Sequence, residues 1–365
     1  MRTDRVLVVN AGSSSLKLRL LEGQAVLRAA DLAADGDVAA ALRDWPTPDV
    51  VGHRVVHGGT AFTGPVRVDD GVRARLAELT DLAPLHQPKS LAALDVVTAR
   101  LPGIPAVACF DTAFHATLPD AAATYAVPQE WRQRWGIRRY GFHGLSHAWA
   151  ARRAAELVGR PLEQLRVVTC HLGAGASVTA VRGGRSVDTT MGFTPLEGLV
   201  MATRSGSVDP GLVLWLLEHE QLGAHEVATA LEQRSGLLAL AGTADLREVE
   251  IRSRAADPRA VLGLEVYLHG LVAGVAAMTA AAGGLDVLVF TGGVGEHSAA
   301  VRARAATALH FLGVALDAAA NSAAGADDRA GGDADVSAAG AAVRTLVVTA
   351  REDLEIAREV RSLLG

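Results

Sequence analysis

One type of segment limits the fold more than any other feature, because it occurs twice. From Val6 an apolar strand runs to Asn10, crosses a turn of Ala, Gly and Ser residues, and continues as a second strand over Leu16–Leu20. The same plan returns in VVTCHLGAGASVTAV (Val167–Val181), where His171 ends the first strand. A repeated supersecondary unit predicts two structurally related halves.

Both turns suit phosphate, because small residues let backbone N–H groups approach an anion and serine hydroxyls add donors. We expect each turn to offer N–H groups to one cleft. A third turn, within Val289–Ser298, leads through three glycines into a helix, whose N-terminus favours anions. Taken singly, each turn also fits an ordinary hairpin or packing turn, and no P-loop motif occurs.

The remaining chain reads as α/β, with Val- and Leu-rich strands among Ala-rich helices. Further strands are expected at Ala106–Phe110, Arg166–His171, Ser177–Val181, Val287–Phe290 and Leu346–Thr349. Helices are expected at Val72–Leu82, Lys89–Ala99, Ser146–Val158, Gly211–Glu220, His225–Gln233, Arg259–Ala282 and Asp353–Leu364. Asp317–Ala342, dense in Ala, Gly and Asp, is interpreted as a loop or short hairpin.

Size and charge exclude several classes. A length of 365 residues suits two domains of moderate size. A formal net charge of −5 is not typical of a protein that binds nucleic acid or a membrane surface. The longest apolar stretch, Leu268–Phe290, is interrupted by Gly283, Gly284 and Asp286, which favours a buried helix, a glycine stop and a buried strand over a membrane span.

The two cysteines, Cys109 and Cys170, lie in apolar runs without metal-ligand spacing. We expect buried free thiols in a reducing compartment. The N-terminal segment has no signal-peptide pattern, because its apolar run breaks at Asn10. Together these features predict a cytoplasmic protein.

Cations are placed unevenly. Only two lysines, Lys17 and Lys89, occur among 35 basic residues, and Lys17 follows the serine-rich turn. Lysine gives a compact point charge, whereas arginine gives a planar fork. Arg54 interrupts an apolar strand, and Arg204 precedes a helix start marked by Ser207, Asp209 and Pro210. Structural ion pairs are one interpretation of these arginines; a clamp on a carboxylate and a phosphoryl group is the other.

Three further polar groups are candidates for chemistry. Asp111 ends a buried strand, His143 lies between glycine-flanked aromatics, and Glu352 opens a C-terminal helix. His143 and Glu352 each have a structural alternative: a satisfied histidine, and an acid that serves the helix dipole. Mg²⁺ is commonly held by one or two carboxylates plus phosphates, so Glu352 is a candidate ligand. With no serine elbow or Cys/His motif, the set favours phosphoryl transfer.

Taken in order, ten segments resemble the acetate kinase family from residue 6 to about 358. They are VNAGSSSLK, GHRVVHGG, LAPLHQP, CFDTAFH, YGFHGLSH, CHLGAGAS, DTTMGFTPLEG, TRSGSVDPG, FTGGVGE and EDLEIAR. The resemblance implies two related actin-like (ribonuclease H-like) domains around a nucleotide cleft. Residues 1–160 plus 353–365 would form the acyl and phosphate domain with a returning C-terminal helix, and residues 161–352 the nucleotide-binding and dimerisation domain.

The implied activity is reversible, direct in-line phosphoryl transfer from MgATP to acetate, giving acetyl phosphate and ADP, in a homodimer. Mn²⁺ is an alternative to Mg²⁺. A kinase for propionate or another short acyl acid is an open alternative, because one methylene discriminates by only about 1–3 kcal/mol. A nucleotide-binding relative with weakened catalysis is another.

The resemblance also implies roles for individual residues. Arg54, Asp111, His143 and Arg204 would be catalytic. Nucleotide and phosphate would contact Asn10, Ser13, Ser15, Lys17, His171, Leu172, Gly173, Ala174, Gly175, Asp245, Leu246, Arg247, Gly293, Val294 and Gly295. The acyl pocket would comprise Val56, Leu85, His86, Phe142 and Pro195, and the metal would lie at Asn10 and Glu352.

Three positions depart from the family pattern. Ala174 and Arg351 stand where the family usually has Asn, and so does His297 in GEH. Losing one donor at a preorganised site can cost roughly 3 kcal/mol at the transition state, so we expect a slower enzyme or a rearranged turn. The segment between Lys17 and Arg54 is also shorter than usual, which predicts a trimmed edge of the N-terminal domain.

Overall fold

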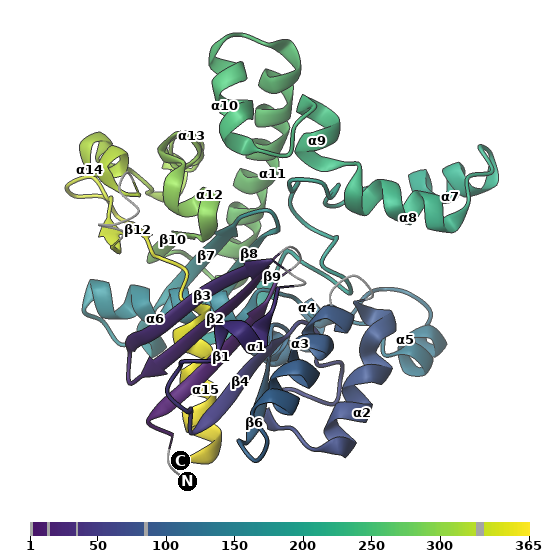
Figure 1. Ribbon diagram of the computed structural model, residues 1–365. Helices are drawn as coiled ribbons and strands as arrows, with labels where there is room; N and C mark the ends of the chain where they lie inside the picture. Colours follow the sequence, from purple (N-terminus) through teal and green to yellow (C-terminus); the bar gives the residue numbers. More distant parts are fainter. Residues whose placement is uncertain (1–2, 13–14, 34–35, 84–86, 326–331) are drawn as a thin grey trace. The chain divides into compact units, whose positions relative to one another are not determined.

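The computed structural model describes residues 3–12, 15–33, 36–83, 87–325 and 332–365. The chain divides into two compact units (Figure 1). Unit 1 comprises Met1–Ala116, Phe142–Trp149 and Arg351–Gly365, and unit 2 comprises Thr117–Gly141 and Ala150–Ala350. Each unit is built on a six-stranded sheet.

The sheet of unit 1 begins with an antiparallel meander of β1 (Arg5–Ala11), β2 (Ser15–Glu22) and β3 (Ala25–Ala33). Two strands then add in parallel to β1: first β4 (Val50–Val55) and then β6 (Ala106–Phe110). The short β5 (Val66–Arg67) pairs antiparallel with β6, so the order is β3-β2-β1-β4-β6-β5.

The sheet of unit 2 repeats this order. Its meander is β7 (Arg166–Leu172), β8 (Ala176–Arg182) and β9 (Arg185–Thr189). Next to β7 lie the parallel strands β10 (Val287–Thr291) and β12 (Arg344–Val347), with the short antiparallel β11 (Ala334–Asp335) outermost. The order β9-β8-β7-β10-β12-β11 matches that of unit 1 strand for strand. The predicted pair of related halves is therefore confirmed.

Side-chain alternation along β1 builds two cores, because successive residues of a strand point to opposite faces. Val6 and Val8 pack with Ile356 and Val360 of α15 (Glu352–Leu364). On the other face, Leu7, Val9 and Ala11 pack with Val97 of α3 (Gln87–Arg100). The helices α1 (Val38–Ala41) and α2 (Asp70–Glu78) complete the set in unit 1, with the 3₁₀ turns η1 (Leu79–Leu82) and η2 (Ala113–Thr117).

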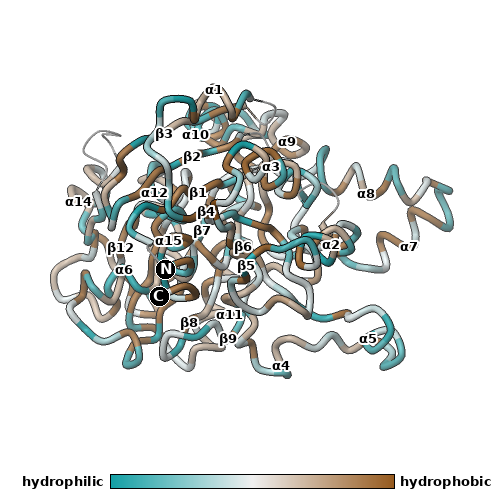
Figure 2. Tube along the Cα trace, turned by 60° about the horizontal axis from the view of Figure 1, so that its bottom comes forward, coloured by the Kyte–Doolittle hydropathy of each residue, from teal (hydrophilic) through white to brown (hydrophobic). Residues whose placement is uncertain are grey.

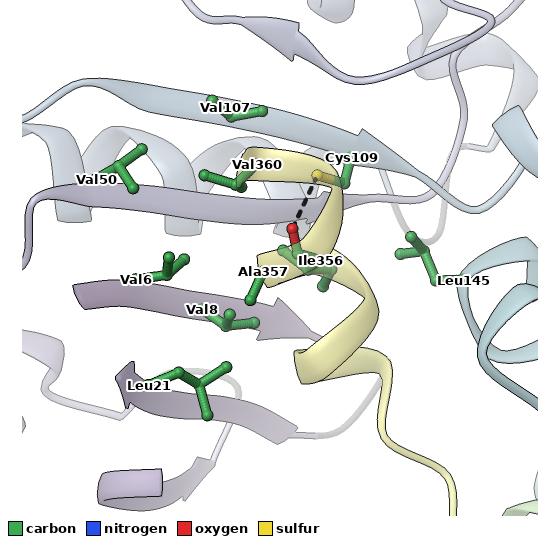
Figure 3. Packing of buried hydrophobic residues seen from close by; sticks show 10 residues of the cluster. All are labelled: Val6, Val8, Leu21, Val50, Val107, Cys109, Leu145, Ile356, Ala357 and Val360. Carbon is green, nitrogen blue, oxygen red and sulfur yellow. Dashed lines mark hydrogen bonds between the residues drawn. The ribbon is translucent and has the colours of Figure 1, made fainter. Parts of the chain in front are cut away.

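Helix α15 lies against the sheet at close range (Figure 3). A Cβ atom added at Gly52 of β4 would lie 2.6 Å from Cγ2 of Ile356 and 2.9 Å from Cγ2 of Val360. Glycine at this position therefore sets how closely the helix can approach. The Cys109 thiol contacts the Ile356 carbonyl across the same interface, at 4.0 Å.

Unit 2 carries most of the helices. They are α4 (Asp120–Ala123), α5 (Gln129–Trp135), α7 (Pro210–Glu218), α8 (Ala224–Gln233), α9 (Gly236–Ala241), α10 (Leu246–Arg254), α11 (Pro258–Ala282), α12 (Gly292–His297), α13 (Ala299–Ala308) and α14 (Ala318–Ala323). The 3₁₀ turns η3 (Leu162–Gln164) and η4 (His310–Leu312) also belong to this unit. Helix α6 (Gly144–Val158) begins in unit 1 and ends in unit 2.

Two of these helices are strongly apolar. Within the described residues, α11 alone is long and apolar enough to cross a membrane by length and composition. It packs on β7 and β8, and ten of its residues are buried; Gly283 ends it in a left-handed conformation before the buried strand β10. It therefore acts as a core helix, as its sequence predicted. In contrast, α7 buries no residue although apolar residues dominate it (Figure 2).

The expected strands and helices all form, with shifts of a few residues at their ends. The interpretation of Asp317–Ala342 was wrong in part, because α14 forms there. Asp317 caps this helix by accepting a hydrogen bond from the Ala320 N–H at 2.8 Å. Cys109 and Cys170 are free and buried, as predicted, and burial raises the pKa of both thiols.

The compact units divide the chain at other residues than the sequence did. Residues 117–141 and 150–160 belong to unit 2, whereas the sequence placed them in the N-terminal domain. The returning C-terminal helix α15 belongs to unit 1. In the shortened segment after Lys17, β3 forms the edge strand of the sheet and is mostly exposed. The separate functions of the two domains stay predictions.

Candidate active site

The polar residues of unit 1 gather where its three parallel strands end. Asn10 lies near the end of β1, Arg54 on β4 and Asp111 directly after β6. Open α/β sheets bind ligands at the carboxyl ends of their strands. The Arg54 guanidinium donates from Nε to Oδ1 of Asp111 at 3.0 Å and from Nη2 to Oδ2 at 2.6 Å. Its Nη1 donates to Oδ1 of Asn10 at 3.2 Å. One guanidinium thus connects all three strands.

Glu352 completes this network from the first residue of α15. The amide of Asn10 donates to Oε2 of Glu352 at 2.7 Å, and Nε of Arg54 lies 4.0 Å from the same oxygen. The side chains of Arg54 and Glu352 are each 14 % exposed, and that of Asp111 is 2 % exposed. Two carboxylates therefore surround one guanidinium in a largely dry environment.

Burial and charge oppose each other in this network. Burial disfavours the charged form of Arg54, but the carboxylates of Asp111 and Glu352 outweigh it and raise the pKa of the guanidinium. Burial pushes the pKa of Asp111 upward, against the pull of Arg54. Because the Asp111 oxygens accept hydrogen bonds from Arg54 at 2.6 to 3.2 Å, we assign an ionised carboxylate paired with a charged guanidinium.

His143 is held in a constrained turn beside Asp111. Its φ angle is +57°, a left-handed conformation that non-glycine residues rarely adopt outside special sites. The Gly144 N–H donates to the Asp111 carbonyl at 2.8 Å, and a ring nitrogen of His115 bonds the Phe142 carbonyl at 3.0 Å. Backbone contacts on both sides therefore set the direction of His143.

The first small-residue turn closes with a bond from the Gly12 N–H to the Ser15 carbonyl at 2.8 Å. Lys17 on β2 pairs with Asn10 on β1 in the sheet register, so both side chains leave the same face of the sheet. The charge of Lys17 is thus carried on the face that holds Arg54 and Glu352. Ser13 lies outside the described residues.

The predicted acyl pocket is described in part. Val56 and Phe142 are buried, at 5 % and 1 % exposure, and the Phe142 ring meets His57 edge-on at 5.5 Å. Pro195 belongs to unit 2. Leu85 and His86 lie outside the described residues.

In unit 2, the second small-residue turn leads into a cavity of about 590 Å³. The turn closes with a bond from the Gly173 N–H to the Gly175 carbonyl at 2.9 Å, after His171 and Leu172 end β7. The cavity is lined by the predicted residues Gly173, Ala174, Asp245, Leu246, Arg247, Gly293 and Val294. Gly295 does not line it; its carbonyl accepts a hydrogen bond from Nη1 of the buried Arg302 at 2.9 Å.

Glu250 and Tyr267 are among the residues lining this cavity that sequence reasoning missed. The Glu250 carboxylate accepts a short hydrogen bond from the Ser298 hydroxyl. The Tyr267 hydroxyl is buried and has no hydrogen-bond partner among the described residues. Both residues lie on helices whose patterns are those of ordinary amphipathic or core helices, so the sequence carried no signal for them.

Arg204 differs from Arg54 in its partners. Its Nη1 donates to the Pro195 carbonyl at 2.8 Å, and within the described part of the chain it makes no ion pair. Burial lowers the pKa of this guanidinium. A desolvated cation bonded only to a carbonyl is suited to an anionic ligand. The predicted helix start follows it, with Asp209 as the cap of α7 and Pro210 in the first turn.

The three departures from the family pattern have their own contacts. Ala174 is exposed, and its carbonyl accepts a hydrogen bond from the Ala202 N–H at 3.2 Å. Arg351 binds the carboxylate of Asp353 through two bonds of 2.9 Å. The His297 ring bonds the Gly325 carbonyl at 3.0 Å and lines the cavity.

No group of three or more His, Cys, Asp or Glu side chains that could hold a metal occurs among the described residues. Mg²⁺ rarely uses such a cage; it keeps waters and takes one or two carboxylates plus substrate phosphates. Glu352, beside the amide of Asn10 and close to the first turn, fits that pattern.

Comparison with known proteins identifies the family, since the model of the acetokinase family matches residues 42–358. The chain belongs to this family. The acetate kinase of Gloeobacter violaceus is 50 % identical over 313 residues, which cover 85 % of this chain and 76 % of the relative. The crystal structure of Porphyromonas gingivalis acetate kinase matches with a TM-score of 0.89 at 35 % identity, over 99 % of this chain and all of that one.

A propionate kinase from Francisella tularensis matches almost as well, with a TM-score of 0.88 at 32 % identity over 98 % of both chains. The predicted α/β fold of two related actin-like domains is confirmed by these acetokinase-family structures and by the matching strand orders of the two sheets. The roles of the individual site residues stay predictions.

Proposed function

We propose that this acetokinase-family chain catalyses reversible transfer of the γ-phosphoryl group of ATP to acetate, giving acetyl phosphate and ADP. The observation that carries the proposal is the buried guanidinium of Arg54, which Asp111 holds beside Asn10 and Glu352 at the ends of three parallel strands. Phosphoryl transfer asks the protein mainly to position groups and to neutralise charge, and this network supplies both.

In the proposed reaction, a carboxylate oxygen of acetate attacks the γ-phosphorus in line with the bond to the leaving oxygen. The new P–O bond forms as the bond between the γ-phosphorus and the β-phosphate oxygen breaks, and ADP leaves with that electron pair. Arg54 and Arg204 would neutralise the carboxylate and the phosphoryl oxygens, and His143 would hydrogen-bond the group in transit. Asp111 would keep the Arg54 fork in place.

Glu352 and Asn10 would hold Mg²⁺, with Mn²⁺ as an alternative. When bound there, the ion would supply positive charge that neutralises the phosphate oxygens. The N–H groups of the first turn, with Ser13, Ser15 and Lys17, would bind phosphate oxygens. In unit 2, His171 and the turn Leu172–Gly175 would contact phosphates, and the cavity at Asp245–Arg247, Gly293 and Val294 would take the nucleoside, next to Gly295.

A kinase for propionate is the second candidate, and the similarity to the Francisella tularensis propionate kinase favours it. The walls of the proposed acyl pocket are Val56, Leu85, His86, Phe142 and Pro195. One additional methylene changes binding by only about 1–3 kcal/mol, so residues of these types would admit both acids.

We also propose that the protein is a cytoplasmic homodimer. Two free, buried thiols suit a reducing compartment. The apolar helix α7, with Leu214 56 % and Trp215 46 % exposed, offers a surface that a second copy would cover. Light scattering on the purified protein measures its mass; a monomer at micromolar concentration would contradict this assembly.

The test of the activity is trapping of acyl phosphate as its hydroxamate, with MgATP, hydroxylamine and acetate, propionate or butyrate. We expect product with acetate or propionate, and the relative rates with the three acids measure which acyl chain length the pocket prefers. Arg54→Ala and Arg204→Ala should lower kcat strongly, whereas Arg28→Ala, on the exposed edge strand β3, should leave it unchanged. ATP binding without product from any acid would indicate that this chain is a nucleotide-binding family member with weakened catalysis. Near-normal turnover of either arginine variant would refute the role proposed for that arginine.

A further inference from the structure

The segment that carries Pro195 and Arg204 has no helix or strand of its own. Residues 190–209 run from the end of β9 to the cap of α7 as an irregular loop. Long irregular loops in compact domains are usually functional, and a reacting group on one needs additional support. Met191 and Met201 are fully buried and anchor the loop hydrophobically. The polar support comes from Glu197.

The Glu197 carboxylate is held from two sides within unit 2. The Tyr125 hydroxyl donates a short hydrogen bond to Oε2, and Nη2 of Arg139 donates to Oε1 at 2.6 Å. Arg139 also reaches the loop backbone, because its Nη1 donates to the Met191 carbonyl at 3.0 Å and to the Thr190 carbonyl at 3.3 Å. Arg139 thus ties the carboxylate to the first residues of the loop.

Tyr125 makes the same connection from the other side. Its oxygen accepts a hydrogen bond from the Phe193 N–H at 3.0 Å while the hydroxyl donates to Glu197. Burial, together with the neighbouring Glu197, raises the pKa of Tyr125, so the hydroxyl keeps its proton. A Cβ atom at Gly192 would lie 1.7 Å from Oε2 of Glu197 and 2.1 Å from the Tyr125 oxygen, so only glycine leaves room for this cluster.

These contacts fix the loop on both sides of Pro195. Phe193 and Glu197, two residues before and two residues after it, are both bound to Tyr125. The Pro195 carbonyl in turn receives Nη1 of Arg204 at 2.8 Å, which is the only hydrogen bond that the described residues give this guanidinium. The direction of the Arg204 fork therefore depends on where the Glu197 cluster holds Pro195.

We propose that Glu197, with Tyr125 and Arg139, is a positioning group that sets Pro195 and Arg204 for the carboxylic acid substrate. The inference rests on the proposed function, because Arg204 matters only if it binds the reacting anion. Glu197 contacts neither substrate nor reacting atoms; it acts through the loop. A displacement of about 1 Å in a positioning group can cost a hundredfold in rate.

The test compares Glu197→Gln and Tyr125→Phe with two control variants in the same unit. Tyr140→Phe removes a hydroxyl that donates to the Gly136 carbonyl instead, and Glu163→Gln changes an exposed acid on η3. For both test variants we expect the KM for the carboxylic acid to rise about tenfold or more, the KM for ATP to change less than about twofold, and the thermal midpoint to stay near that of the controls. A purely structural role would shift both KM values and the midpoint together, which would overturn the proposal.

A double-mutant cycle checks the route of the effect. If Glu197 acts through Arg204, then Glu197→Gln should add little to the loss of activity caused by Arg204→Lys. If the two residues act independently, the two fold-losses would multiply in the double variant. Multiplicative losses would overturn the proposal. Wild-type protein that makes no acyl hydroxamate from any acid would refute the proposed function and this inference with it. An active wild type whose Glu197→Gln variant keeps the acid KM would refute this inference alone.

Discussion

Replacing His53 by Leu should stabilise this protein at neutral pH and weaken its sensitivity to acid. His53 lies on β4, is 1 % exposed, and has no hydrogen-bond partner at either ring nitrogen among the described residues. A buried polar atom without a partner costs about 1–3 kcal/mol, and leucine has a similar volume without that atom. The His53→Leu variant should therefore gain about 1–3 kcal/mol of unfolding free energy at pH 7.

The predicted loss of stability at acid pH follows from the protonation of His53. Burial lowers its pKa from 6.5 to about 3 in the folded protein. Between these values the unfolded chain binds a proton that the folded chain excludes, so stability is present above pH 6.5 and falls as the pH falls. At about 1.4 kcal/mol per pH unit, His53 alone should cost about 2 kcal/mol at pH 5. His57 and His115, each with a pKa lowered by burial to about 4, act in the same direction.

Urea unfolding at pH 7 and pH 5 measures both effects. We expect the difference in unfolding free energy between the two pH values to be about 2 kcal/mol smaller in His53→Leu than in wild type. His225→Leu, at an exposed position of α8, is the control and should keep the wild-type difference. An unchanged difference in His53→Leu, or a loss of stability at pH 7, would show that His53 is charged or hydrogen-bonded in the folded protein and would refute the reasoning.

Three other substitutions test the site and the core. Asp111→Asn leaves the Arg54 charge without its carboxylate. The unfolding free energy should therefore fall by about 3 kcal/mol, and kcat should fall about a hundredfold. The control Asp95→Asn breaks an exposed pair with Arg73 and should cost less than about 1 kcal/mol in urea unfolding. Gly52→Ala places a methyl 2.6 Å from Ile356 and should cost about 1–3 kcal/mol, whereas Gly64→Ala meets no atom within 4 Å and should be neutral; equal costs would exclude close packing of α15 as the cause. Ala174→Asn restores a side-chain donor at the second turn and should raise kcat in the hydroxamate assay, up to about a hundredfold. An equal or lower kcat would mean that a backbone N–H already donates the hydrogen bond that the Asn side chain was expected to restore.

The sequence predicted the architecture well, because its strongest signals are local. Val6–Asn10 and Val167–His171 both run from a buried strand into a small-residue turn, and each became the central strand of its sheet. The strands that sequence reasoning did not name, β3, β5, β9 and β11, all lie at sheet edges, where short or half-exposed strands give no clean alternation. Helix α14 was missed for a related reason: Ala, Gly and Asp composition resembles a loop unless the cap at Asp317 is recognised.

Single residues of the site were predicted by motif, whereas the geometry of their contacts follows from the fold. The sequence marked Arg54 as an unusual cation within a strand, and its bidentate partner Asp111 lies 57 positions away, directly after β6. Only the parallel pairing of β4 with β6 brings the two together. Glu197 lies within the quoted segment DTTMGFTPLEG, but that motif did not indicate its role, because its partners Tyr125 and Arg139 come from a distant segment.

Helix α15 has a consequence for the order in which the chain can fold during synthesis. The face of the unit 1 sheet that bears Val6, Val8 and Val50 is covered by residues 352–364, which leave the ribosome after all of unit 2. Domains generally fold as units during synthesis, N-terminal first. Here we expect the reverse: unit 2 is complete while unit 1 still exposes one hydrophobic face. Chains truncated at Ala350 should therefore bind a hydrophobic dye through unit 1 and hold unit 2 protected from protease. Equal protection of both units would contradict this order. If the order holds, the exposed face of the unit 1 sheet is the surface on the growing chain to which a chaperone would bind.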